Sequence, residues 1–284
     1  MLSDFSSFSK TDLASERFHA NTSIRGVSYS EETTLAGVWE RINISSQEGA
    51  KSIGRPMGIY NTLNVGRMEL LDEERISDVK KELSKELKKL INEMCVLPRR
   101  LLIVGFGNPV LTADSLGFEA AKKVRPTLHI KTMDESFFST LNCSELAVIA
   151  PGVPSMTGLE SIITVSGICN KIKPNAVIAI DAIAARSTER LGSTIQISTT
   201  GIIPGSGLGN HNSAINEENT GAPVLSIGVP TVISADEFCR EINPKNQEKH
   251  KSHKMFVSPK EIDEIILVAA RIIGESINQA FGLY

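Results

Sequence analysis

LLIVGFGNPVLTADSLG, residues 101–117, joins an unbroken apolar run to a turn rich in Gly, Asn and Pro, and then to the start of a helical pattern. Further apolar runs follow it along the chain: ELAVIAPGV at 145–153, AVIAID at 176–181 and VLSIGV at 224–229. Runs without a polar face are typical of strands that are covered on both sides. With helical patterns between them at 114–124 and 158–172, they predict an α/β fold, a mostly parallel sheet flanked by helices.

Two longer amphipathic helices are expected to cover this sheet. Apolar residues recur at three- and four-residue steps from Asp72 to Met94, and Asp72 can cap the first turn of the helix they predict. A second pattern runs from Pro259 to Phe281. It begins with Ser258-Pro259-Lys260-Glu261, which predicts a capping box with proline at the first helical position.

The remaining segments predict less regular structure. Residues 1–20 lack a sustained period and suit an exposed arm. Residues 24–66 hold short apolar stretches broken by Gly and Pro, which predict an appendage of short strands and loops. The polar, lysine-rich stretch at 243–254 is expected to be a solvated loop.

Composition and charge exclude several classes of function. Thirty basic and thirty-three acidic residues give a net charge of -3, which offers no attraction to nucleic acid phosphates. The four cysteines are scattered without zinc spacing, which favours a reducing compartment. No segment reaches the roughly 18 apolar residues that span a bilayer, so we expect a cytoplasmic protein that binds neither nucleic acid nor membrane.

Two strands of the predicted sheet deliver an aspartate to its carboxyl edge. Asp114 follows the turn after the first strand, and Asp181 comes directly behind five apolar residues. Ligands collect at this edge in open parallel sheets. Two partly desolvated carboxyl groups that share a crevice cannot easily both ionise, so the pair could act as acid and base on one water. Alternatively, Asp114 caps the next helix, and Asp181 binds a ribose hydroxyl or pairs with Arg186.

Other motifs give weaker signals. GFGN lacks the spacing of a dinucleotide fingerprint, and neither a GxxxxGK[ST] phosphate loop nor a GxSxG nucleophile motif is present. The glycine-rich loops at 150–158 and 201–210 would let backbone approach a ligand closely, although tight turns also explain them. His129 and His211 are kept as candidate polar members of the site, although ordinary surface is the favoured interpretation of each.

The order of the motifs resembles the germination protease family. The resemblance rests on GFGNPVLTADSLG, IAPGVPSMTGLES, IDAIAARSTERLGSTIQIS and APVLSIGVPTVISA, and it extends weakly over GRPMGIYNTLNV at 54–65. It implies a fold like that of the hydrogenase maturation peptidases. It also implies an endopeptidase of the spore core, made as a zymogen, that degrades small acid-soluble spore proteins during germination. The oligomeric state is left open, with a homo-oligomer among the expectations.

The resemblance also assigns roles to residues and divides the chain. The family's two catalytic aspartates match Asp114 and Asp181. One carboxyl would take a proton from water, while the other would donate to the carbonyl oxygen and later to the leaving nitrogen, with no metal and no cofactor. The expected parts are a pro-segment at 1–12, an N-terminal appendage at 13–68 and a peptidase core at 69–284.

Loop residues are candidates for contacts with the substrate or the oxyanion. Backbone N–H groups near Gly107, Asn108, Gly152 and Gly205 could serve in this way. Ile203 lies where family members often carry histidine, so no auxiliary histidine is expected there.

TDLASERF, residues 11–18, resembles the TEFASE motif at which the family's substrates and zymogens are cut. The match predicts self-processing between Asp12 and Leu13. As structure alone, Thr11 could cap a short helix with an incomplete capping box.

Two alternative functions are kept. One is a hydrogenase-maturation-type peptidase that senses a bound metal, although this chain has a single aspartate in ADSLG and no obvious histidine partner. The other is a catalytically silent protein that uses the same crevice for binding.

Overall fold

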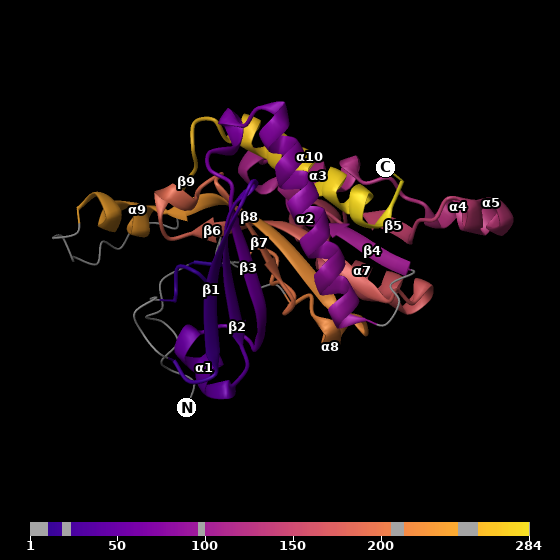
Figure 1. Ribbon diagram of the computed structural model, residues 1–284, viewed down its shortest axis with the longest axis horizontal. Helices are drawn as coiled ribbons and strands as arrows, with labels where there is room; N and C mark the ends of the chain where they lie inside the picture. Colours follow the sequence, from indigo (N-terminus) through magenta and orange to yellow (C-terminus); the bar gives the residue numbers. More distant parts are fainter. Residues whose placement is uncertain (1–10, 19–23, 96–99, 206–212, 244–254, 284) are drawn as a thin grey trace.

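The computed structural model describes residues 11–18, 24–95, 100–205, 213–243 and 255–283 (Figure 1). Within these residues one sheet of nine strands has the order β1-β2-β3-β7-β8-β6-β4-β5, and β9 pairs with β8. The strands are β1 (Val27–Thr34), β2 (Gly37–Ile44), β3 (Gly58–Asn64), β4 (Arg100–Gly105), β5 (Glu145–Ile149), β6 (Ala176–Ala185), β7 (Thr194–Ser198), β8 (Val224–Ser234) and β9 (Phe256–Val257).

Helices lie between most of the strands of the second half of the chain. The α-helices are α1 (Gln47–Ile53), α2 (Glu73–Met94), α3 (Leu116–Lys123), α4 (Leu128–Met133), α5 (Glu135–Thr140), α6 (Pro154–Thr157), α7 (Ser161–Ile172), α8 (Glu217–Thr220), α9 (Ala235–Ile242) and α10 (Ile262–Phe281). Short 3₁₀ turns occur at η1 (Met68–Leu70), η2 (Thr112–Asp114) and η3 (Thr188–Arg190). No helix among the described residues is long and apolar enough to cross a membrane.

The sheet is covered by helices on both faces, which confirms the predicted α/β fold. Apolar residues of α2, α3 and α10 share one buried cluster with Ile178 and Ile180 of β6 and Ile195 of β7. On the opposite face Val165 and Cys169 of α7 pack against alternate residues of β4 and β6. Each buried Leu or Ile side chain contributes about 1.5–3 kcal/mol to folding, so this layered core holds the strands in register.

The sheet is mixed, whereas the sequence pattern predicted a mostly parallel one. The strands β5, β4, β6 and β8 are parallel neighbours, and the pairs β1–β2, β2–β3, β3–β7, β7–β8 and β8–β9 are antiparallel. The difference arises after β6. The connection through η3 to β7 contains no crossover helix, so β7 returns in the opposite direction.

The N-terminal strands extend the same sheet. The strands β1, β2 and β3 form an antiparallel meander, and β3 pairs with β7 from Tyr60↔Ser198 to Asn64↔Thr194. Figure 1 shows this meander reaching away from the helical core, with α1 near its far end. The strands predicted for residues 24–66 are therefore present, and the division of the chain at residue 68 stays a prediction.

The predicted start of one long helix, α2, is confirmed, and the predicted start of the other, α10, is wrong. Asp72 caps α2 as predicted, since its Oδ1 accepts from Arg75 N at 2.9 Å. The capping box predicted at Ser258–Glu261 is wrong. Pairing of β9 with β8 keeps the chain extended to Val257, and α10 begins at Ile262 without a side-chain cap. The predicted loop at 243–254 lies, apart from residue 243, outside the described residues.

The segment 11–18 was expected to be an exposed arm, and this expectation is wrong for most of it. Thr11 is buried, and Leu13 and Ala14 are 0% exposed. The segment stays close to the sheet because its polar groups bond to other parts of the chain rather than to water, as the site below describes.

Candidate active site

The two aspartates come from different elements. Asp114 ends η2, just before α3, and Asp181 lies within β6, where it pairs with Gly228 of β8. The strand continues to Ala185, so Asp181 is not at the strand end that its sequence position suggested. The loop that leads to Asp114 is tied to β6, because Phe106 N, directly after β4, donates to the carbonyl of Ile180 at 2.8 Å.

A tight turn aims the Asp114 carboxylate back at its own loop. Its Oδ2 accepts from Asn108 N at 2.9 Å, and the first residue of α3 is not capped by a side chain. Asp114 is therefore not a helix cap. Gly107 makes this turn possible with φ +109°, a conformation that side chains rarely adopt, and a Cβ there would meet Asp114 O at 1.8 Å.

The alternative partner suggested for Asp181 is engaged elsewhere. Arg186 Nε lies 3.6 Å from Glu237 Oε2, and the Arg186 backbone N–H donates to Glu16. Asp181 Oδ2 accepts instead from Gly205 N at 3.3 Å. A candidate loop glycine thus contacts the carboxyl group directly.

Burial dominates the electrostatics of both aspartates. Asp181 is 2% exposed, and burial, followed by the charge of Asp114, raises the pKa of Asp181 well above its ordinary value despite the bond from Gly205 N. Burial also raises the pKa of Asp114, which the bond from Asn108 N opposes. Asp181 is thereby favoured as the protonated member and Asp114 as the more readily ionised one.

A cavity of about 360 Å³ is lined by Asp114 and by Gly205, whose N–H bonds to Asp181. Its lining comes from η2, the end of β6, the loop after β7, β8 and the chain around β9: Leu111, Thr112, Ala113, Asp114, Ala182, Ile183, Ala184, Gly205, Thr231, Val232, Phe256, Ser258 and Ile262. Thr231 Oγ1 donates to Ala113 O at 2.7 Å and so fixes η2 to β8. Most of these lining residues are apolar, and among them Asp114 has the one ionisable side chain.

The structure brings together some of the candidate residues and leaves others apart. Gly205 and Asn108 bond to the two aspartates, and Gly107 shapes the turn of one of them. Gly152 does not line the cavity, and its carbonyl accepts from Ser161 Oγ at 3.0 Å. His129 is exposed, and His211 lies outside the described residues.

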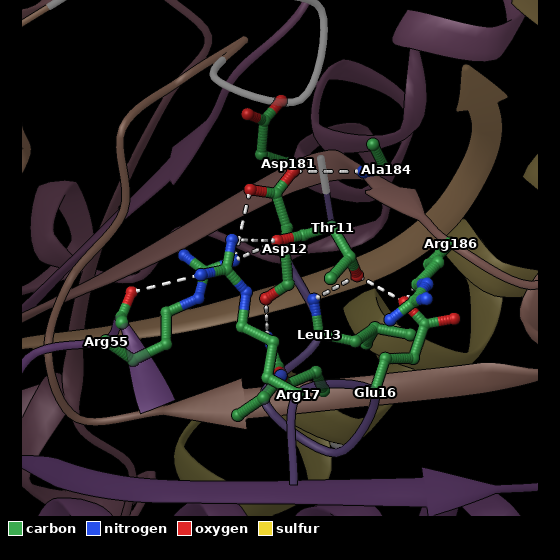
Figure 2. Close-up of polar contacts among 12 residues, drawn as sticks. Thr11, Asp12, Leu13, Glu16, Arg17, Arg55, Asp181, Ala184 and Arg186 are labelled. Carbon is green, nitrogen blue, oxygen red and sulfur yellow. Dashed lines mark hydrogen bonds and ion pairs between the residues drawn. The ribbon is translucent and has the colours of Figure 1, made fainter. Parts of the chain in front are cut away.

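The N-terminal segment is seated beside β6, beyond Asp181 (Figure 2). Asp12 N donates to Ala184 O at 2.9 Å, and Ala184 N donates to Asp12 Oδ2 at 3.0 Å. The charge of Asp12 adds to the effects that raise the pKa of Asp181, after burial and Asp114. The bond between Asp12 and Leu13, the predicted processing site, therefore lies in the neighbourhood of the aspartate pair.

Further contacts hold the rest of the segment. Arg55 Nη2 donates to Thr11 O at 2.7 Å and lies 3.4 Å from Asp12 Oδ1 (Figure 2). Leu13 packs in a small apolar cluster with Ile183, Ala185, Leu191 and Ile202. Glu16 accepts from the backbone N–H groups of Arg186 and Ser187, both at 2.8 Å.

Gln196 of β7 bonds to the segment and was missed by sequence reasoning. Its Nε2 donates to Asp12 O at 3.1 Å, and its Oε1 accepts from Ala14 N at 2.9 Å. The one available signal was the amide in the middle of TIQIS, where the other strand positions are apolar or hydroxylic. Arg55 carried no comparable signal, because an arginine between Gly54 and Pro56 suits any surface turn.

Comparison with known proteins gives the class of protein. The family model described as germination protease matches residues 9–242. Germination proteases of Clostridium perfringens and Caldanaerobacter subterraneus are each 34% identical to the chain, over 95% of it and over 94% and 93% of their own lengths. The germination protease of Bacillus cytotoxicus is 39% identical over 80% of this chain and 63% of its own.

The chain is similar to the solved structure of the [NiFe] hydrogenase maturation protease HycI from Thermococcus kodakarensis. The match covers 66% of this chain and 99% of the HycI chain, with a TM-score of 0.37 and 19% sequence identity. The sequence matches define a peptidase. More particularly, the chain belongs to the germination protease family.

Proposed function

We propose that this protease is an endopeptidase made as a zymogen, which begins the degradation of small acid-soluble spore proteins in the spore core at germination. Asp114 and Asp181 would activate the water. The observation that carries the proposal is the seating of the chain's own TDLASE sequence beside a buried aspartate whose pKa is raised.

The electrostatics support distinct roles for the two carboxyl groups. Ionised Asp114 takes a proton from a water molecule while the oxygen of that water attacks the carbonyl carbon of the bond to be cut. Protonated Asp181 donates its proton to the carbonyl oxygen, which gives a tetrahedral diol. The leaving nitrogen then receives the proton that Asp114 took from water, and not one from Asp181 as first expected, because Asp181 has already given its proton to the carbonyl oxygen. Asp181 recovers its proton from a diol hydroxyl as the C–N bond breaks.

Mass spectrometry of the purified chain after incubation at mildly acidic pH tests the proposal. We expect loss of residues 1–12 from the parent chain and retention of full mass in Asp181→Asn. If the parent keeps Asp12 joined to Leu13 while cleaving an acidic spore-type peptide, self-processing at this bond is wrong. If Asp181→Asn cuts as fast as the parent, the catalytic assignment is wrong.

A chelator separates this mechanism from that of a metal-sensing peptidase. Among the described residues no group of three or more His, Cys, Asp and Glu side chains is placed to hold a metal ion. We expect peptide cleavage to persist after dialysis against chelator. Complete loss of cleavage, with recovery on adding back a divalent cation, would reject the two-aspartate mechanism.

A further inference from the structure

Gln196 and Asp181 occupy equivalent positions on either side of one strand. Asp181 of β6 and Gln196 of β7 are both register partners of Gly228 in β8. Register partners project their side chains from the same face of a sheet. The residues adjacent to each, Ile180 and Ile195, lie in the cluster under α2 and α10, so Asp181 and Gln196 project from the opposite face.

Gly228 carries no side chain between these two residues, and the side chain of Ile183 fills the space above it. A Cβ at this position would meet the side chain of Ile183 at 2.8 Å. Strand spacing of about 4.8 Å places the backbones of β6 and β7 roughly 10 Å apart, with β8 between them. Leu13 packs against Ile183 on this same face, and Asp12 bonds to both Ala184 of β6 and Gln196 of β7, so the segment crosses the sheet on top of Ile183.

The carboxamide of Gln196 reaches the carbonyl of the proposed scissile bond. Nε2 donates to Asp12 O, while Oε1 accepts from Ala14 N, so one side chain holds the backbone on both sides of Leu13. Gln196 is 8% exposed, and its two hydrogen bonds hold its amide in one orientation. A fixed donor on this oxygen is suited to stabilise the charge that develops there during attack by water.

Cationic and N–H groups meet the two acids of the segment. Arg55 faces the Asp12 carboxylate, whose other oxygen accepts from Ala184 N. Four residues farther along, both oxygens of Glu16 accept from successive backbone N–H groups at Arg186 and Ser187. Each of these two sites selects for an acid. The carboxylate meets two donors, and the NH₂ group of an amide would face one of those donors instead of accepting from it.

We infer that substrate chains bind as the segment Thr11–Glu16 does, with Gln196 as the donor to the scissile carbonyl and Arg55 as the residue that selects an acid before the cut. This inference rests on the proposed function. It assigns the first acid of TDLASE to Arg55 and the second to the backbone N–H groups of Arg186 and Ser187.

Steady-state cleavage of the peptide TDLASERF by the processed protein tests the role of Gln196. Gln196→Glu keeps an acceptor for Ala14 N and loses the donor to the carbonyl, and Gln196→Ala loses both. We expect kcat to fall about a hundredfold in each at neutral pH, with a smaller change of KM, as for loss of an oxyanion donor. Thermal unfolding identifies a variant that fails to fold. Parental kcat in a folded variant would overturn the role of Gln196.

The preference for acid over amide before the cut tests Arg55. Rates are compared for TDLASERF and TNLASERF with the parent, with Arg55→Gln, and with Arg67→Gln as a control at an exposed arginine that pairs with Glu69. We expect the parent and control to favour the acidic peptide at least tenfold, and Arg55→Gln to lose that preference. An unchanged ratio in Arg55→Gln would overturn this assignment. A parent that cuts neither peptide would instead contradict the proposed function.

Discussion

Asp181 and Asp114 are electrostatically coupled, although one lies within a central strand and the other at the end of a 3₁₀ turn. Burial, and after it the charge of Asp114, raises the pKa of Asp181 well above its ordinary value. The coupling makes the protonation of one carboxyl depend on the other, and it gives predictions for stability and for activity.

Stability should depend on pH through Asp181. An acid whose pKa is raised by folding binds more protons in the folded state, so its burial costs nothing below its unfolded pKa of about 4 and costs progressively more as pH rises to the folded pKa. Asp181→Asn removes this cost. We expect the variant to match the parent in free energy of unfolding near pH 3 and to exceed it at pH 7, by about 1.4 kcal/mol for each unit of raised pKa. Urea unfolding across this range would contradict the prediction if the difference did not grow with pH.

Activity should fall as pH rises through the raised pKa of Asp181, because the proposed donor then loses its proton. Asp114→Asn should lower cleavage by about 10²- to 10⁴-fold, the usual contribution of one acid or base. It should also lower the pKa of Asp181, since the charge of Asp114 is removed. A pH profile of the residual cleavage by Asp114→Asn would then have its alkaline limb at lower pH than the parent. A limb at the parental position would argue against the coupling.

Gly107→Ala should damage the site through the backbone. The new Cβ would meet Asp114 O, and the φ of +109° is one that alanine rarely adopts. We expect a loss of about 1–3 kcal/mol in free energy of unfolding, with a larger loss of cleavage as Asp114 is displaced. Gly158→Ala is the matched control, because Gly158 also has positive φ, at +73°, but nothing within 4 Å of the added Cβ. Equal effects of both variants on cleavage would contradict this account.

Glu16→Gln should slow self-processing without preventing folding. The variant exchanges a charged acceptor of two backbone N–H groups for a neutral amide. Hydrogen bonds to charged groups contribute about 1.5–3 kcal/mol, so roughly a tenfold or greater loss of rate is expected. The time course of the loss of residues 1–12, followed by mass spectrometry, measures it. Glu48→Gln, a change in the first turn of α1, should process at the parental rate.

Much of the fold could be predicted from the sequence because its signals are local. The unbroken apolar runs predicted β4, β5, β6 and β8, and the cap at Asp72 predicted the start of α2. The antiparallel pairing of β7 was missed, because β7 takes its direction from a short return and its partner β3 from a part of the chain more than a hundred residues earlier.

The residues of the site also divide into those with a local signal in the sequence and those without one. Asp114 and Asp181 follow apolar runs in the sequence, and their proximity follows from parallel strands in a sheet. Gln196 and Arg55 have no local pattern, since their roles depend on where the N-terminal segment lies. That segment was expected in solvent because its polar letters carry no period. Asp12, Ala14 and Glu16 instead bond to Ala184, Gln196 and the backbone after β6, respectively.

Arg17 and Arg55 both donate to the carbonyl oxygen of Thr11, and burial together with the charge of Arg55 lowers the pKa of Arg17 to about 10. A cut after Asp12 would carry away this shared acceptor and the Asp12 carboxylate, and it would leave a new ammonium group on Leu13 nearby. Three cations would then crowd a half-buried space, which favours the lifting of residues 13–18 from the groove. Cleavage after Asp12 would thus remove groups that hold residues 13–18 in place. Because a peptide bond is cut, the release would be irreversible.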